Sequence, residues 1–296
     1  MALRSCRFEP DLRYDFLLEG GLLFINKTVG ILGAGNMGEA LIRGVLKASL
    51  MRPNQIIASR RDPERLVRLH TDLRVRTTTD NAALVTASDV VLCCVKPQHA
   101  LDTLKGLANV FRSDQTLISI VAGVPIDSLE AVFNENVPIV RVMPNTPSLV
   151  GEAATGYCLG RYATASHALE AAEIFSAVGI ALQAEESHMN AITAVSGSGP
   201  AYIFYLLEAL YEGASAVGLP RELAEALVKQ TVLGAARLVS DTGRHPSELR
   251  EAVTSPGGTT EAALRVLKDG GFLDLVRDAI VAARDRGVEL GEQREN

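Results

Sequence analysis

Short apolar runs rich in β-branched residues alternate with amphipathic segments between about residues 28 and 185. The runs predict strands at Thr28–Leu32, Gln55–Ser59, Arg74–Thr77, Val90–Val95, Thr116–Val121, Pro138–Val142 and Ile180–Gln183. The segments between them predict helices at Asn36–Ala48, Pro63–His70, Asn81–Ala87, Ala100–Phe111, Pro125–Phe133 and Ala165–Val178. Strand–helix alternation is typical of a doubly wound α/β fold, whose parallel sheet is covered on both faces.

After about residue 186 the strand pattern stops and long amphipathic segments follow. They predict helices at Pro200–Val217, Pro220–Asp241, Pro246–Val253, Thr260–Lys268 and Phe272–Leu290. Three of these segments open on a proline, the residue favoured at the first helical position. So small an all-α half has little core of its own, and we expect it to bury its apolar faces against a second copy of the chain.

The pattern therefore predicts a Rossmann-like α/β domain at 27–185 and an all-α dimerisation domain at 186–296, the half to which the motifs and the resemblance described below assign substrate binding. Residues 1–26, which precede the first predicted strand, are interpreted as a non-essential extension or as a start assigned too early. Charges interrupt every apolar run in them, so we predict no signal peptide there. The longest stretch without Asp, Glu, Lys or Arg, Ser187–Leu207, is too polar for a membrane span.

Composition narrows the class of protein. Of 296 residues, 47% are hydrophobic and 22% charged, which fits a globular chain and excludes disorder as its main state. The net charge of −6, with no basic run, argues against nucleic acid as the main partner. The four cysteines (Cys6, Cys93, Cys94 and Cys158) lack metal-ligand spacing, so we predict no metal site and a reducing, cytoplasmic location.

A glycine-rich turn, Gly33-Ala34-Gly35-Asn36-Met37-Gly38, follows the first strand and opens the first helix. This GxGxxG pattern carries weight because it stands in the strand–turn–helix context of a Rossmann dinucleotide site. The first glycine allows the tight turn, the second lets the backbone approach the pyrophosphate, and the third lets helix and strand pack closely. The free amides at the helix N-terminus would hold the pyrophosphate.

The end of the second strand bears on the choice between NAD and NADP. An NAD site would place Asp or Glu there for the ribose 2′-hydroxyl, whereas this chain has Ser59-Arg60-Arg61. These side chains can bind a 2′-phosphate, so we predict NADP(H). The nearby carboxylate of Asp62 leaves NAD(H) open, and two solvated arginines are the alternative interpretation.

Two further turns, Cys94-Val95-Lys96-Pro97 and Val121-Ala122-Gly123-Val124, follow the fourth and fifth predicted strands. Ligands bind at this edge of such sheets, so both turns are expected to contact ribose and nicotinamide. Lys96 either contacts the cofactor or is a solvated lysine at the start of a loop.

A second candidate anion site is the loop Thr254–Thr260, which precedes a predicted helix. Its hydroxyls, its two glycines and the amides at the helix N-terminus suit a carboxylate ligand. The alternative is an ordinary helix cap with a flexible lead-in, which needs only one hydroxyl.

From about Lys27 to Leu290 the chain resembles the pyrroline-5-carboxylate reductases. The motifs that carry the resemblance are GAGNMG at 33–38, VKP at 95–97, RVMPNTP at 141–147, SGSGPAY at 196–202 and HP…VTSPGGTT at 245–260. The resemblance implies reduction of L-1-pyrroline-5-carboxylate to L-proline with NADPH or NADH, the last step of proline biosynthesis. It also implies a homo-oligomer built through the C-terminal helices, a dimer that in many members assembles into a decamer.

The same resemblance implies site residues. The substrate would be held by Glu186, Ser255, Gly258, Thr259 and Thr260, with the Thr260 hydroxyl beside the ring nitrogen as the catalytic group. Together, the motifs and the resemblance place cofactor contacts at Leu32, Gly33, Ala34, Gly35, Asn36, Met37, Ser59, Arg60, Arg61, Asn81, Cys94, Val95, Lys96, Pro97, Ile120, Val121 and Ala122. Ala252 departs from the family, because some relatives carry a polar cofactor contact there.

Two alternatives stay open: a reductase of the same fold acting on another imine or keto substrate, and a cofactor-binding regulator without turnover. Related hydroxyacid dehydrogenases place a catalytic lysine early in the helical half. No lysine lies between Lys105 and Lys229, which disfavours that chemistry.

Overall fold

A computed structural model describes residues 23–295 of the chain. Contacts divide the chain into two compact units, one of residues 1–197 with 284–296 and one of residues Ser198–Ala283. The segment Glu186–Gly197 packs with the first unit, although the sequence pattern assigns it to the helical half.

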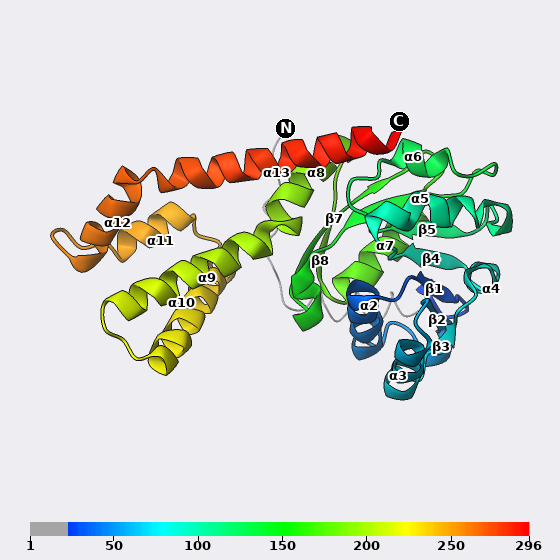
Figure 1. Cartoon of the computed structure of the whole chain (residues 1–296), viewed down its shortest axis with the longest axis horizontal. Helices are drawn as coiled ribbons and strands as arrows, with labels where there is room; N and C mark the ends of the chain where they lie inside the picture. The colour runs from blue at the N-terminus through cyan, green and yellow to red at the C-terminus, as the bar shows by residue number, and fades with distance from the viewer. Residues whose placement is uncertain (1–22, 296) are drawn as a thin grey trace. The chain divides into compact units, whose positions relative to one another are not determined.

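An eight-stranded sheet, ordered β3-β2-β1-β4-β5-β6-β7-β8, forms the centre of the first unit in the described part of the chain (Figure 1). Its strands are β1 Val29–Leu32, β2 Ile56–Ser59, β3 Arg76–Thr78, β4 Val90–Cys93, β5 Thr116–Ser119, β6 Ile139–Met143, β7 Ala153–Leu159 and β8 Gly179–Gln183. All neighbouring pairs are parallel except β6 and β7. The predicted doubly wound α/β fold is confirmed, with one antiparallel pair added.

Helices cover both faces of the sheet, as Figure 1 shows. They are α2 Asn36–Lys47, α3 Pro63–Leu73, α4 Asn81–Thr86, α5 Pro97–Lys105, α6 Ile126–Glu130 and α7 Ala165–Ser176. Successive strand residues point to opposite faces, so Val90 and Leu92 pack with α2 and α7, while Val91 and Cys93 pack with α4, α5 and α6. This two-sided burial explains the continuous apolar strands.

The prediction missed β7. The segment Ala153–Leu159 reads AATGYCL, and its glycine and threonine hide the strand pattern. A second difference concerns 100–111, predicted as one helix: α5 begins at Pro97 and ends at Lys105, and a 3₁₀ turn follows at Ala108–Val110. Strand β3 also begins two residues later than predicted.

The end of the predicted extension belongs to the folded unit. Phe24 is fully buried in the core beside β1, and the Gln55 side chain donates hydrogen bonds to the carbonyls of Phe24 and Lys27. Burying an aromatic side chain of this size is worth about 2 kcal/mol, so these residues contribute to stability. Residues 1–22, including Cys6, lie outside the described residues.

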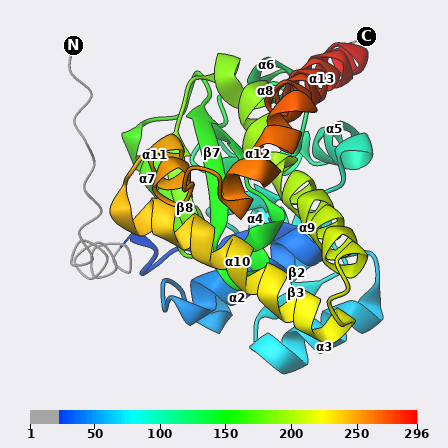
Figure 2. The ribbon, with the colours of Figure 1, turned by 90° about the vertical axis from the view of Figure 1, so that its left-hand side faces the viewer.

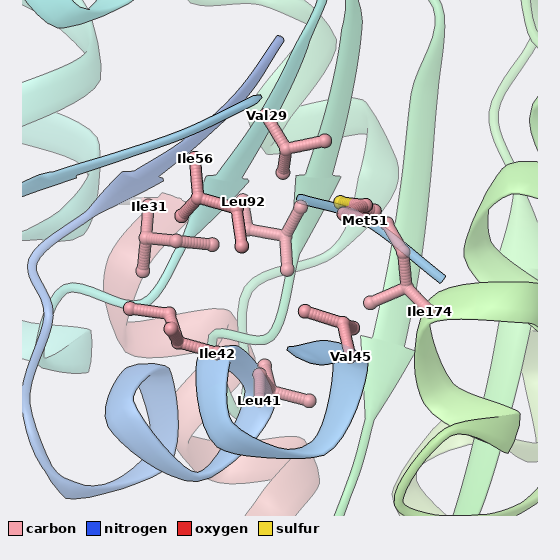
Figure 3. A pocket seen from close by; sticks show the side chains of 9 residues that line it. All are labelled: Val29, Ile31, Leu41, Ile42, Val45, Met51, Ile56, Leu92 and Ile174. Carbon is pink, nitrogen blue, oxygen red and sulfur yellow. The ribbon is translucent and has the colours of Figure 1, made fainter. Parts of the chain in front are cut away.

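A small cavity of about 10 Å³ lies in the core between β1 and α2 (Figure 3). The side chains that line it are all apolar: Val29, Ile31, Leu41, Ile42, Val45, Met51, Ile56, Leu92 and Ile174. An apolar space of this size offers no partner to a water molecule, so it is a packing defect and not a ligand site.

The segment after β8 forms short helical turns, at Glu186–His188 and Met189–Ile192, and then a π-helix at Thr193–Gly197. Asn145 ties this segment to the sheet, because its side-chain amide donates to the Ser196 carbonyl (2.9 Å) and its oxygen accepts from the Ala154 amide (3.0 Å). Gly197 packs so closely on Met143 that a Cβ there would lie 2.5 Å from the Met143 methyl.

The second unit is all helical, as predicted (Figure 2, yellow-green to orange). Its helices are α9 Gly199–Ala216, α10 Arg221–Thr242, α11 Pro246–Ala252, α12 Thr259–Asp269 and the start of α13, which runs Phe272–Glu295. Within α9 to α12 only Ala224 is buried, while side chains such as Phe204, Leu227 and Leu267 are exposed. These exposed apolar side chains can be buried only by contact with a partner molecule.

Among residues 23–295, every helix falls short of the length and apolar character that a bilayer crossing requires.

Candidate functional site

A pocket of about 470 Å³ lies at the carboxyl ends of β1, β2 and β4, the edge where nucleotides bind in doubly wound sheets. It is lined by Gly33, Gly35, Ser59, Arg60, Arg61, Asp62, Asn81, Cys94, Val95, Lys96, His99, Asp102 and Thr103. Most of these residues are predicted cofactor residues that the fold brings together from four loops. Asp62, His99, Asp102 and Thr103 were not among them.

The glycine turn has the geometry that its sequence predicts. Gly33 has a φ of +85°, and the amides of Gly33 and Ala34 donate to the Ser59 carbonyl at 3.1 and 2.8 Å. A Cβ at Gly33 would also lie 3.0 Å from the Val95 side chain, so both backbone angle and space require glycine. Gly38 lets α2 approach β1, since a Cβ there would lie 3.0 Å from Ile31.

The end of β2 presents cationic and hydroxyl groups to the pocket. The Arg60 guanidinium donates to the Ala34 carbonyl at 3.0 Å, which holds it over the glycine turn. The Ser59 hydroxyl is buried and has no hydrogen-bond partner among the described residues. An unpaired buried hydroxyl is costly, and a phosphate or ribose oxygen in the pocket would satisfy it. These residues therefore fit a phosphorylated dinucleotide.

Because of the Asp62 carboxylate, the sequence left NAD(H) open as an alternative cofactor. In the structure this carboxylate already has partners on α3. It caps α3 by accepting from the Arg65 amide (3.3 Å) and lies 3.6 Å from the Arg65 guanidinium. Both interactions reduce its repulsion of a phosphate beside Arg60 and Arg61.

The remaining predicted cofactor residues do not line the pocket: Leu32, Ala34, Asn36, Met37, Pro97, Ile120, Val121 and Ala122. The side chains of Leu32 and Val121 are buried, so only their main chain could contact a ligand. The Met37 sulfur instead accepts a hydrogen bond from the Ser148 hydroxyl at 3.2 Å, joining α2 to the loop after β6.

One wall of the pocket was missed because α5 begins at Pro97, three residues before the predicted start. A helix begun there places His99, Asp102 and Thr103 on one face, at i, i+3 and i+4. The preference of proline for the first helical turn was the signal that could have revealed them.

Burial lowers the reactivity expected of the thiols of Cys93, Cys94 and Cys158. Burial raises the pKa of Cys93 to about 11 and also raises that of its neighbour Cys94, which lines the pocket. Burial likewise raises the pKa of Cys158 to about 12. The reactive thiolate is therefore scarce at neutral pH.

We expect iodoacetamide at pH 8 to leave Cys93, Cys94 and Cys158 unmodified in the folded protein. For a thiol of pKa 11, only about one molecule in a thousand is a thiolate at that pH. Peptide mass spectrometry would check this, with the urea-unfolded protein as the control that labels at all three positions. Rapid labelling of Cys94 in the native protein would contradict it.

Glu186, predicted to bind substrate, is held within the first unit. Its carboxylate accepts from the Ile126 amide at 2.6 Å and from the Arg141 guanidinium at 3.1 Å. The Arg141 side chain is only 7% exposed, whereas that of Glu186 is 37% exposed. The pair thus joins β6, the start of α6 and the turn after β8, and its role toward substrate stays a prediction.

Replacing Glu186 with alanine should lower the free energy of unfolding by about 2 kcal/mol. The change leaves a buried guanidinium unpaired, at a cost reduced because Glu186 is partly solvated. Urea denaturation would measure it. Glu185→Ala, at the exposed neighbouring position, is the matched control and should change stability by less than about 0.5 kcal/mol. Equal effects of the two variants would contradict the role assigned to the pair.

In the second unit, the loop Thr254–Gly258 joins α11 to α12. Gly258 is the N-cap of α12, and no side chain caps this helix, so its first amides have no side-chain acceptor. The Ser255 side chain lies against Gly258, where a Cβ would approach its oxygen to 2.4 Å. The Gly257 amide donates to the Glu261 carboxylate at 2.6 Å. Ser255, Gly258, Thr259 and Thr260 are therefore gathered at one helix N-terminus, as the sequence predicts.

The described residues contain no cluster of three or more His, Cys, Asp and Glu side chains that could hold a metal ion.

Two family models match parts of the chain. Residues 186–290 match the family model for pyrroline-5-carboxylate reductase dimerisation, and residues 28–123 match that for NADP oxidoreductase, coenzyme F420-dependent. The chain is 44% identical over 268 residues to the pyrroline-5-carboxylate reductase of Methanosarcina acetivorans, covering 90% of this chain and 99% of that one.

Two solved structures are similar over nearly the whole chain. A pyrroline-5-carboxylate reductase from Coxiella burnetii is 37% identical with a TM-score of 0.84, covering 89% of this chain and 98% of that one. The Plasmodium falciparum pyrroline carboxylate reductase, solved with NADP bound, is 31% identical with a TM-score of 0.82, covering 90% and 98%. With this identity sustained through both units, the chain belongs to the pyrroline-5-carboxylate reductase family.

Proposed function

We infer that this protein reduces L-1-pyrroline-5-carboxylate to L-proline with NADPH, the last step of proline biosynthesis. The observation that carries the inference is 44% identity to a pyrroline-5-carboxylate reductase over 90% of the chain. The pocket supports the cofactor assignment, because an unpaired buried hydroxyl and two arginines stand where a 2′-phosphate would lie. NADH is the second, weaker cofactor.

The reaction adds a hydride to the imine carbon and a proton to the ring nitrogen, which turns the C=N bond into a C–N bond. NADPH, when bound, supplies the hydride. We propose that the amides at the start of α12 and the Ser255 hydroxyl hold the substrate carboxylate. The Thr260 hydroxyl would hydrogen-bond the ring nitrogen, and Glu186 would lie at the edge of the substrate site. Such positioning supplies most of the acceleration, since an iminium needs little further acid catalysis.

On the cofactor side, we propose that the amides of the glycine turn hold the pyrophosphate, and that Ser59, Arg60 and Arg61 hold the 2′-phosphate. Asn81, the turn Cys94–Pro97 and the turn Ile120–Ala122 would contact the ribose rings and the nicotinamide through small or main-chain groups.

The protein is a homo-oligomer, as its match to a dimerisation family and the exposed apolar side chains of α9 and α10 indicate. We propose that five dimers assemble into a decamer, which light scattering of the purified protein would test. A cytoplasmic location is part of the same proposal, supported by the free thiols of Cys93, Cys94 and Cys158.

Steady-state reduction of L-1-pyrroline-5-carboxylate with each cofactor tests the function. We expect turnover with a higher kcat/KM for NADPH than for NADH, and proline as the product. A panel of other cyclic imines and of 2-keto acids identifies a different substrate if one exists. NADPH binding without turnover of any panel member would contradict the proposal and favour a regulator.

A further inference from the structure

The wall of the nucleotide pocket on α5 carries two polar side chains that the pyrophosphate and 2′-phosphate do not require. His99 and Asp102 lie one helical turn apart, and both line the pocket together with the residues at the end of β2. Neither side chain has a hydrogen bond or ion pair with another described residue. Their polar groups are therefore free for a ligand.

Three of the neighbouring side chains in the pocket already have partners within the protein. The Thr103 hydroxyl donates to the His99 carbonyl at 2.7 Å, and Asp62 caps α3. Arg60 is anchored to the glycine turn through the Ala34 carbonyl. The pocket thus has two arginines at the end of β2, whereas α5 contributes the imidazole of His99 and the carboxylate of Asp102.

The charges indicate which part of a dinucleotide each wall takes. A phosphate belongs beside the arginines, because the carboxylate of Asp102 would repel it. The α5 wall therefore faces an uncharged group. A neutral imidazole offers one N–H donor, and an ionised aspartate only accepts. Adenine presents the complementary pair along one edge, the N7 acceptor beside the N6 amino donor.

We propose that His99 and Asp102 select the adenine base of the cofactor, with the imidazole donating to N7 and the carboxylate accepting from the N6 amino group. The inference rests on the proposed function, since it takes the dinucleotide phosphate as the ligand. Helix α5 would then recognise the adenine base, and the residues at the end of β2 would recognise the 2′-phosphate.

The test compares NADPH with reduced nicotinamide hypoxanthine dinucleotide phosphate, which keeps N7 but carries a carbonyl in place of the N6 amino group. Dissociation constants are measured by nicotinamide fluorescence with the full-length oligomer. We expect the wild type to bind the hypoxanthine analogue about tenfold more weakly than NADPH, because Asp102 then faces a carbonyl oxygen. Asp102→Asn should reduce this ratio to about twofold or less, since an amide can donate to the carbonyl or accept from the amino group.

His99→Ala should act differently. Both nucleotides keep N7, so both dissociation constants should rise about fivefold and their ratio should stay that of the wild type. Asp127→Asn is the charge-matched control: this exposed aspartate on α6 does not line the pocket, and it should leave the ratio unchanged.

A wild-type ratio near one, or a ratio that Asp102→Asn leaves unchanged, would overturn the inference while NADPH binding itself upholds the proposed cofactor. Failure of the wild type to bind NADPH at all would overturn the proposed function instead.

Discussion

Replacing Thr260 with alanine is expected to lower kcat/KM for L-1-pyrroline-5-carboxylate about a hundredfold, the usual effect of losing a positioned proton-transfer or hydrogen-bonding group. Thr260 lies in the first turn of α12, and the first amides of this helix have no side-chain cap. The methyl group of alanine preserves the helix, so the loss should come from the hydrogen bond to the ring nitrogen. Steady-state kinetics at saturating NADPH would measure it, with the dissociation constant of NADPH unchanged within about twofold.

Two further variants test whether the loss of activity comes from the Thr260 hydroxyl itself. Thr260→Ser keeps the hydroxyl and should recover most of the activity. Thr86→Ala removes an exposed hydroxyl that donates only to the Ala82 carbonyl on α4, and should leave kcat/KM unaltered. Turnover by Thr260→Ala at the wild-type rate would refute the role proposed for this residue.

The double variant Arg60→Ala, Arg61→Ala should raise the dissociation constant of NADPH about a hundredfold and that of NADH less than about threefold. Charge-assisted hydrogen bonds to a phosphate are worth about 1.5–3 kcal/mol each, and NADH has no 2′-phosphate to lose them. The larger part should come from Arg60, which is half-buried and fixed by the Ala34 carbonyl, whereas Arg61 is exposed. Titration of nicotinamide fluorescence with both cofactors would measure the effect.

Arg68→Ala is the matched control, since Arg68 is an exposed cation on α3 that does not line the pocket. It should move both dissociation constants by less than about twofold. Because phosphate binding is electrostatic, added salt should weaken NADPH binding to the wild type more than to the double variant. Equal losses of NADPH and NADH affinity in the double variant would show that the arginines do not read the 2′-phosphate.

Local features of this protein could be predicted from its sequence because their causes are local. The turn at Gly33 requires a positive φ, which only glycine adopts freely, and the motif stands between an apolar run and a helix pattern. The helices of the second unit were recognised with their ends nearly correct, since prolines and glycines mark where such helices begin and end.

Other features could not be predicted because distant segments produce them. Strand β7 carries a weak pattern, and it forms because β6 and β8 pair with it on either side. The ion pair of Arg141 and Glu186 joins residues that no local rule connects. The burial of Phe24 beside β1 likewise depends on the finished core.

The amino-acid sequence by itself determined the doubly wound half, the helical half, the glycine turn and the two places where anions are expected to bind. Each follows from periodicity, turn chemistry or a helix N-terminus, which act over a few residues. Only the tertiary structure decided that α5 lines the same pocket as the two arginines, that Asp62 caps a helix, and that Glu186 is paired with Arg141. Those outcomes depend on which side chains become neighbours and which partner each one then binds. Such neighbours exist only after strands that are far apart in the chain have come to lie side by side.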